Sequence, residues 1–215
     1  MTTTIGLVSD VHSSPLPLRQ AMDIFEREKV DDIICAGDIA GYYDGVAPTV
    51  ELLLQSACKA VAGNHDQSWL DKKPGDQDPG VRAYLQALPR RLELEIEGKK
   101  LLVVHANPPA EQSGGIKLLD QQGNVIEERR LEWTDRLSAL DCDVLIVGHT
   151  HQVYALELGE VFVVNPGSTV FNHCCMILSL PDLSVRSFAL DNRNIVKCWN
   201  FSMLYSEGAI GGPEA

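Results

Sequence analysis

The sequence has no long hydrophobic segment and no excess of basic residues, and these two absences exclude whole classes of protein. No apolar run approaches the ~20 residues that a membrane-spanning helix needs. Lys and Arg number 18 against 30 Asp and Glu, which gives a formal net charge of -12 at pH 7. Such an acidic chain is repelled by long nucleic acids and by anionic membranes. We expect neither as a partner, although bound metal ions can reverse the local field and admit a small anionic substrate.

The cysteines lack the spacing of a metal or redox site, because none of the six form a CxxC pair. Cys35 and Cys142 lie in or beside apolar runs, which is typical of small core residues in a reducing compartment. The first residues also lack the basic segment and apolar stretch of a secretory signal. Together these features predict a cytoplasmic protein.

The 215 residues contain no repeat, low-complexity tract or linker. A chain of this length can bury a core without disulfide bonds. We expect a single domain over residues 1–200. Three glycines and a proline after residue 201 predict a poorly ordered tail over residues 201–215.

Hydrophobic periodicity predicts strands alternating with helices, followed by a strand-rich second half. Uninterrupted apolar strands between helices indicate a sheet that is covered on both faces. The expected helices are residues 16–28, 46–56 and 127–140. The expected strands are residues 5–9, 33–36, 59–62, 92–97, 101–104, 144–147, 153–158, 161–164, 175–180 and 185–190. A long loop over residues 107–126, with a small hairpin at 118–125, is of a length that is often functional.

Residue types that bind metals follow five of the expected strands. The carboxyl ends of strands line the ligand crevice of open α/β sheets, so these five segments can converge. Five of the six histidines fall in them, which is hard to explain by separate structural roles. The segments are Ser9-Asp10-Val11-His12, Gly37-Asp38, Gly63-Asn64-His65-Asp66, His105 and Gly148-His149-Thr150-His151.

The spacing within these segments suits metal binding. In extended chain, residues i and i+2 point to the same side, so Asp10 with His12, and His149 with His151, can each direct two ligands to one region. A glycine precedes the ligand in three segments, where it permits a sharp turn and a close approach of the backbone.

The donor atoms are carboxylate oxygen, imidazole nitrogen and amide oxygen. This set suits Mn, Fe, Zn, Co or Ni better than copper(I) or an iron–sulfur cluster. The donors are too many for one ion, and two-metal hydrolytic sites hold their ions about 3.5–4 Å apart. One carboxylate must then bridge the ions, and Asp38, alone at the centre of the series, is the candidate.

These segments resemble the calcineurin-like metallophosphoesterase superfamily, and within it the small bacterial and archaeal phosphodiesterases. The motifs DxH, GD, GNH, H and GHTH occur in order, followed by Asn165-Pro166-Gly167-Ser168, and the resemblance covers roughly residues 4 to 190. It implies an α/β fold, a four-layer α-β-β-α sandwich of two mixed sheets flanked by helices. It also implies two divalent transition metal ions, with Mn favoured.

Position by position, the resemblance places Asp10, His12 and His151 on one ion. It places Asn64, His105 and His149 on the second, with Asp38 bridging the two. It implies in-line attack by a metal-activated hydroxide, without a covalent phosphoenzyme. Asp38 and His65 are the implied catalytic residues, and His65 orients the phosphate or protonates the leaving oxygen.

Two departures from the family bear on the substrate. Many relatives carry an Asp at the position of Gly41, where it orients the GNH histidine, so His65 lacks that partner and Asp44 or Asp66 could substitute. Protein phosphatases of the superfamily place an Arg next, whereas this chain has no Arg in that segment before Arg82. The sequence therefore favours a monoanionic phosphodiester over a dianionic monoester.

Three functional hypotheses follow. The first is a phosphodiesterase acting on a small ester, such as a cyclic or dinucleoside phosphate. In such an enzyme Tyr42 and Tyr43 either stack on a base of the substrate or pack against the protein. The second is a phosphomonoesterase or protein phosphatase with the same site. The third is a protein-interaction scaffold, as in the retromer subunit that resembles a phosphoesterase. The intact ligand set favours an enzyme.

Overall fold

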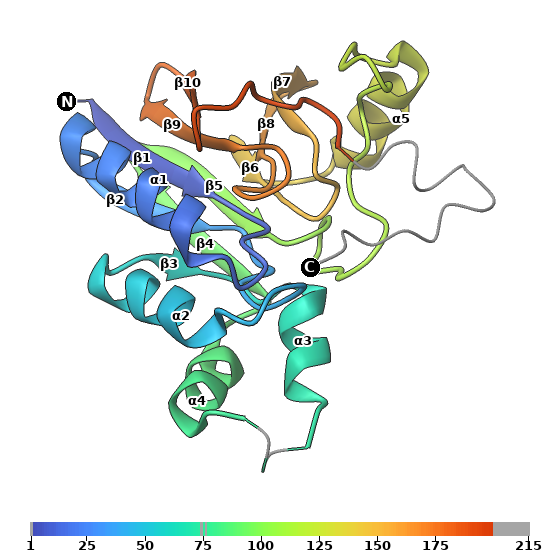
Figure 1. The fold of residues 1–215 in the computed structure, drawn as a ribbon. Helices are drawn as coiled ribbons and strands as arrows, with labels where there is room; N and C mark the ends of the chain where they lie inside the picture. The colour runs from blue at the N-terminus through green and yellow to red at the C-terminus, as the bar shows by residue number, and fades with distance from the viewer. Residues whose placement is uncertain (1, 74, 76, 200–215) are drawn as a thin grey trace.

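Two mixed five-stranded sheets form the centre of the molecule, and the computed structural model describes residues 2–73, 75 and 77–199 (Figure 1). The tail predicted over residues 201–215 lies outside the described residues. In the first sheet β1 is parallel to β2 and antiparallel to β9, and in the second β6 is parallel to β5 and β8. The first sheet has the order β10 (Ser184–Ala189), β9 (Cys174–Leu180), β1 (Thr3–Val8), β2 (Asp32–Cys35), β3 (Lys59–Ala60). The second has the order β4 (Arg91–Ile96), β5 (Lys99–Val104), β6 (Val144–Ile146), β8 (Val161–Pro166), β7 (Val153–Leu158).

The described residues form five helices, and three of them confirm the prediction. These three are α1 (Pro15–Glu28), α2 (Val46–Gln55) and α5 (Glu127–Leu137). Two short helices, α3 (Asn64–Leu70) and α4 (Pro79–Ala87), were not predicted. The sequence did indicate the start of α4, because Asp78 is a residue type that caps helices and Pro79 follows it. In the structure the Asp78 carboxylate accepts a hydrogen bond from the Val81 N–H at 3.0 Å.

Alternation along the strands sends side chains into separate layers of the core. In β1, Ile5 and Leu7 point between the sheets, while Val8 packs with α1, α2 and α4 on the outer face of the first sheet. On the outer face of the second sheet, Trp133 and Leu137 of α5 pack against β5, β6 and β8. The result is the four-layer α-β-β-α sandwich that was predicted.

The loop at residues 107–126 contributes to the core. Its predicted hairpin is confirmed by the Asp120 N–H bonding the Asn124 carbonyl at 2.9 Å. Ile116 and Leu118 are fully buried against the second sheet. The Gln152 side chain accepts hydrogen bonds from the Leu118 and Leu119 N–H groups at 2.8 and 3.0 Å. This part of the loop is therefore anchored to the sheet rather than placed over the strand ends as a lid.

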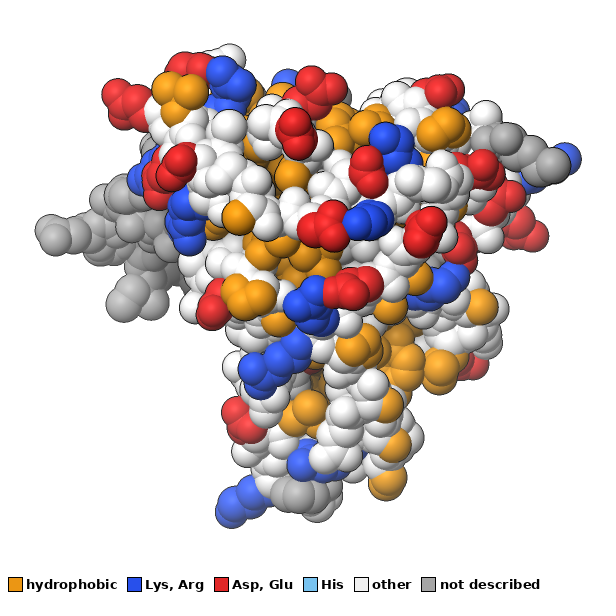
Figure 2. All heavy atoms as spheres, turned by 180° about the vertical axis from the view of Figure 1, so that it is seen from behind, with side chains coloured by type: hydrophobic (Ala, Val, Ile, Leu, Met, Phe, Trp, Pro, Cys, Tyr) orange, Lys and Arg blue, Asp and Glu red, His pale blue; other side chains and the backbone are white. Residues whose placement is uncertain are grey.

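The surface carries charges of both signs (Figure 2). No described helix has the length and apolar content to cross a bilayer. On the face shown in Figure 2, Lys and Arg side chains are scattered among Asp and Glu. This face therefore offers no continuous basic track for a nucleic-acid backbone.

The contact between β1 and α1 gives a stability prediction. A Cβ at Gly6 would lie 2.7 Å from the Phe25 ring, which is itself fully buried. Gly6→Ala should therefore overpack this layer and lower the free energy of unfolding by about 1–3 kcal/mol, measured by urea denaturation. Ser187→Ala, on an exposed position of β10, is the control and should change it by less than about 0.5 kcal/mol. Equal effects of the two substitutions would contradict the packing account.

Candidate metal centre

Three groups of His and Asp side chains gather where the strand-ending segments meet. Within each group the potential ligand atoms lie within 4.8 Å of one another. Adjacent groups share either His12 or Asp38, so the three form one continuous cluster. The groups are Asp10, His12, His151; His12, Asp38, His65; and Asp38, His105, His149.

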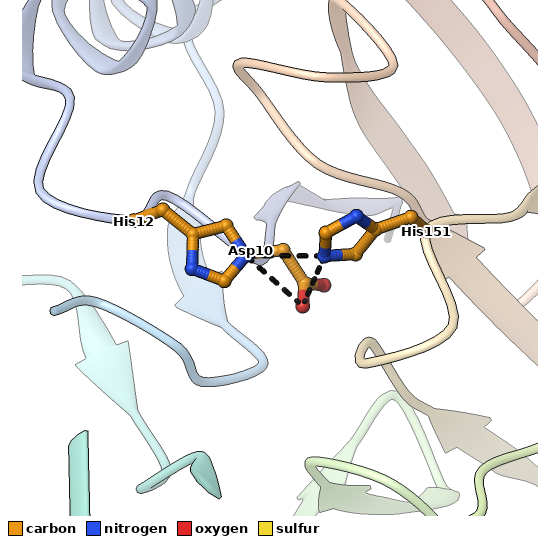
Figure 3. Close-up of side chains that lie close together, drawn as sticks. All are labelled: Asp10, His12 and His151. Carbon is orange, nitrogen blue, oxygen red and sulfur yellow. Dashed lines mark hydrogen bonds and ion pairs between the residues drawn. The ribbon is translucent and has the colours of Figure 1, made fainter. Parts of the chain in front are cut away.

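The first group brings together the loops after β1 and β6. The Nε2 atoms of His12 and His151 are 3.1 Å apart, and both imidazole rings point toward the Asp10 carboxylate (Figure 3). Asp10 Oδ1 lies 3.3 Å from His151 Nε2 and 3.9 Å from His12 Nε2. All three side chains are buried. Two nitrogens and one oxygen thus face a common point, as a metal ion requires.

The second side of the cluster is centred on Asp38 and Asn64. His105 Nε2 lies 3.3 Å from Asp38 Oδ2 and 3.1 Å from Asn64 Oδ1. The same Asn64 oxygen lies 2.9 Å from His149 Nδ1. The His105 Nδ1 hydrogen bonds the Ala36 carbonyl at 2.8 Å, which fixes the ring with Nε2 toward the cluster. The amide oxygen of Asn64 therefore lies within hydrogen-bond distance of both histidines.

His65 is half-buried and differs from the other histidines in its surroundings. Its backbone N–H donates to Asp38 Oδ1 at 2.8 Å. Its ring lies 4.9 Å from the ring of His12 and 4.6 Å from that of Tyr42, measured between centroids. The rings of His12 and Tyr42 thus lie beside the His65 ring, and a carboxylate oxygen of Asp38 lies within 4.8 Å of one of its nitrogens.

The two acidic substitutes considered for orienting His65 do not do so in the described part of the chain. Asp66 is fully buried, and its two oxygens accept hydrogen bonds from the Ala40 and Gly63 N–H groups at 2.7 and 2.8 Å. Asp66 therefore ties together the two loops that carry Asp38 and Asn64. No hydrogen bond joins Asp44 to the His65 ring within those described residues.

The backbone at the cluster is unusual, and it corrects the reasoning from extended chain. Five candidate ligands have φ between 49° and 64°, namely Asp10, His12, Asp38, His149 and His151. Positive φ is uncommon for residues other than glycine and gathers at functional sites. The pairs are therefore not extended, and His149 and His151 lie in different groups rather than pointing to one region. Hydrogen bonds from Asp10 N to Gly37 O and from His12 N to Asp38 O, both 2.9 Å, hold two of these loops together.

Close backbone approach, predicted from the glycines in the motifs, is confirmed. A Cβ at Gly63 would lie 2.1 Å from Asp38 Oδ1, and one at Gly148 would lie 1.9 Å from Ser9 Oγ. Any larger residue at these two positions would displace Asp38 or the Ser9–Asp10 segment. The glycines thus set the distances within the cluster.

Several buried polar residues support the ligands and were not assigned roles from sequence. The Ser9 hydroxyl donates to Asp10 Oδ2 at 2.7 Å, and the Ser168 hydroxyl donates to the Asp10 carbonyl at 2.6 Å. Asn172 Nδ2 donates to the His151 carbonyl at 2.9 Å. Asn165 donates to the Gly148 carbonyl at 3.0 Å, so the Asn-Pro-Gly-Ser turn holds the loop that carries His149. The position of Ser9 directly before Asp10 could have indicated its supporting role, whereas nothing in the sequence indicated that of Asn172.

Burial and the neighbouring charges set the protonation of these groups. Burial lowers the pKa of His12 and of His149 to about 4, so both imidazoles are neutral at pH 7 and have a free lone pair. Burial also acts to lower the pKa of His105, but the Asp38 carboxylate outweighs it and raises that pKa to about 9. Burial acts to raise the pKa of Asp10, yet His151 and the other histidines hold it below its usual range. His12 and His149, as neutral imidazoles beside ionised carboxylates, therefore have the protonation state that a metal ligand needs, whereas His105 must release a proton when a metal ion binds.

The residues present therefore fit divalent metal ions of the Mn, Fe, Zn, Co or Ni class. The donors are two carboxylates, imidazole nitrogens and an amide oxygen at ligand spacing. Buried carboxylates and imidazoles arranged in this way are costly unless they pair or bind a cation.

Comparison with known proteins agrees with this geometry. Residues 3–178 match the calcineurin-like phosphoesterase superfamily domain. The chain belongs to the calcineurin-like phosphoesterase superfamily. Members of this superfamily use divalent metal ions, which is consistent with the Asp and His groups described above.

Individual proteins are similar to the chain in sequence or in fold. Phosphodiesterase MJ0936 of Methanocaldococcus jannaschii is 26% identical over 182 residues, which cover 84% of this chain and 90% of that protein. The crystal structure of a metallophosphoesterase from Sphaerobacter thermophilus superposes with a TM-score of 0.66 at 21% identity, over 87% of this chain and 88% of the other. Vacuolar Protein Sorting 29 from Cryptosporidium parvum has the same fold, with a TM-score of 0.54 at 19% identity over 87% and 98% of the two chains.

The structure shows why residue 41 has no room for the aspartate expected from the family resemblance. A Cβ at Gly41 would lie 2.4 Å from His12 Nδ1. The Gly41 N–H bonds the Ser13 hydroxyl at 3.1 Å, which keeps this backbone against the loop after β1. An acidic side chain therefore has no room at residue 41 unless His12 moves.

An aspartate at residue 41 should therefore weaken metal binding. We expect Gly41→Asp to weaken Mn²⁺ binding about tenfold or more, because it displaces His12, with affinity measured by isothermal titration calorimetry. Gly75→Asp adds the same charge where a Cβ meets nothing within 4 Å, and should leave the affinity unchanged. Unchanged Mn²⁺ affinity in Gly41→Asp would show that the close contact with His12 does not constrain the site.

Proposed function

We propose that the protein is a phosphodiesterase that hydrolyses a small phosphodiester with two divalent metal ions. The observation that carries the proposal is the continuous cluster in which Asp38 belongs to two of the three ligand groups. The name of a relative, phosphodiesterase MJ0936, supports the same reaction class. The proposed setting is the cytoplasm, which is in keeping with six free cysteines.

The assignment of ligands follows the grouping of the side chains. Asp10, His12 and His151 would hold one ion, and Asn64, His105 and His149 would hold the other. Asp38 would bridge them, because its carboxylate lies beside His12 on one side and His105 on the other. The oxygen and nitrogen donors suit Mn, Fe, Zn, Co or Ni, and the family resemblance favours Mn among them. Two such ions bind phosphate oxygens and lower the pKa of a bound water.

His65 is the proposed proton donor or phosphate-orienting group. It is half-buried, as His149 is, and its backbone is held by Asp38 while its ring lies against His12 and Tyr42. An imidazole that can reach both solvent and the metal centre can protonate a leaving alkoxide. The ring contacts keep it directed at the space in front of His12.

The residues next to the centre favour a diester over a monoester. A phosphomonoester carries a second negative charge, and an Arg fork is the usual group that binds it. The chain instead has Tyr42 next to Gly41, and the Tyr42 ring lies against His12 and His65. A phosphomonoesterase or protein phosphatase is the alternative with the same site.

A protein-interaction scaffold is the alternative from another class. Similarity to Vacuolar Protein Sorting 29 concerns the fold alone. A scaffold has no need of a ligand set, yet all seven candidate ligands here are residues that can bind metal. The complete ligand set therefore favours an enzyme.

A pair of chromogenic esters tests the proposal. Metal-stripped protein should hydrolyse bis-p-nitrophenyl phosphate after Mn²⁺ is restored and should prefer it to p-nitrophenyl phosphate. Asp38→Asn should abolish turnover and lower the amount of bound metal, because the bridging charge is lost. Preference for the monoester would support the phosphatase alternative. Absence of both turnover and metal binding with Mn, Fe, Zn, Co or Ni would support the scaffold.

The role of His65 has its own prediction. His65→Asn should lower kcat for the diester by about 10²–10⁴-fold, because the proton donor is removed, while bound metal stays as in the unaltered protein. Metal content by atomic emission separates this result from damage to the ligands. A kcat close to that of the unaltered protein would exclude His65 from proton transfer and phosphate orientation.

A further inference from the structure

Aromatic side chains gather at one border of the metal centre. Phe, Trp and Tyr make up 6% of the sequence, yet four of them lie in one chain of ring contacts beside the Asp10–His12–His151 group. We call these four the aromatic border, namely Tyr42, Tyr43, Phe171 and Trp199. They come from two distant parts of the sequence, so the fold places them together.

The inner half of the aromatic border is a fixed base. Phe171 is buried, stacks on Trp199 with ring centroids 4.0 Å apart, and stacks on His151 at 5.3 Å. The Trp199 N–H donates to the His151 carbonyl at 3.2 Å, which ties the indole segment to the ligand loop. The rings of Phe171 and Trp199 are therefore held in place against the loop that carries His151.

The outer half is exposed, and Tyr42 lies directly against the site. The Tyr42 ring is 4.6 Å from the rings of both His12 and His65 and 5.5 Å from Phe171, yet the residue is 60% exposed. Tyr43 is 41% exposed and lies 6.3 Å from Phe171. A large exposed ring in contact with a polar catalytic centre leaves one face for a ligand.

We propose that Tyr42 stacks on a planar aromatic group of the substrate and thereby directs the enzyme to nucleotide phosphodiesters. The inference rests on the proposed function, because the metal centre must hold the phosphate while Tyr42 holds the base. Phosphate recognition falls to the metal ions, so the rest of the substrate is recognised by ring faces rather than by cations. A tyrosine ring can stack on any of the bases. The site therefore selects nucleotide diesters as a class and does not distinguish one base from another.

Two diesters with one leaving group test this specificity. Thymidine 5′-(p-nitrophenyl phosphate) and methyl p-nitrophenyl phosphate both release p-nitrophenolate, but only the first carries a base on the retained group. The protein reconstituted with Mn²⁺ should show a higher kcat/KM for the thymidine ester. The ratio of the two kcat/KM values is the readout, because damage to the metal centre lowers both values together.

Tyr42→Ala should lower that ratio about tenfold, mainly through a higher KM for the thymidine ester, which is the scale of one base–aromatic stack. Tyr42→Phe keeps the ring and should keep the ratio. Leu131→Ala removes an apolar side chain of similar exposure, 57%, from α5 and serves as the control.

An unchanged ratio in Tyr42→Ala, or equal losses with both esters, would overturn the inference and leave Tyr42 as support for His65. Hydrolysis of both esters by the unaltered protein without preference would also overturn it, while the proposed phosphodiesterase function would stand. Hydrolysis of neither ester with any of the five metals would instead reject the proposed function, and the inference with it.

Discussion

Two carboxylates and three imidazoles are buried together where the ends of the two sheets meet, and their mutual attraction organises the site. Isolated, each of these groups would lose its hydration at a cost of several kcal/mol. Together they compensate one another, since His151 lies 3.3 Å from Asp10 and His105 lies 3.3 Å from Asp38. The same attraction keeps both carboxylates ionised despite complete burial. A cation bound among them would meet donors that are already placed and already charged.

That arrangement depends on backbone that the rest of the fold holds in place. Five ligands have positive φ, and hydrogen bonds join the loops that carry them, such as His149 N to Asp10 Oδ2 at 3.0 Å between the two sheets. Strain of this kind, of order 1–3 kcal/mol per residue, persists only where surrounding contacts over-determine the conformation. Here Asp66 supplies such contacts from one segment, and Asn165 and Ser168 supply them from another.

The same tight packing shapes what can bind in front of the metal centre. Gly41 leaves His12 its place and excludes an acidic side chain, while the next residue, Tyr42, places its ring against His12. A ring face in place of a cationic side chain offers less attraction to a dianion and more apolar surface to an organic group. In the proposed function, reaction class and substrate preference therefore depend on neighbouring but separate residues.

The sequence by itself determined the layered fold and the members of the ligand cluster. Strand periodicity is a local property, and each motif directly follows its strand, so both can be read without knowing the partners. Motif spacing alone did not determine how the ligands divide. The family resemblance implied the division, and the tertiary structure agrees, because His149 and His151 lie two residues apart yet belong to different groups. Only the tertiary structure decided that Asp66 ties two loops together, and that Phe171 contacts both Tyr42 and Trp199. These contacts join separate loops, so they depend on chain packing, and no local pattern encodes them.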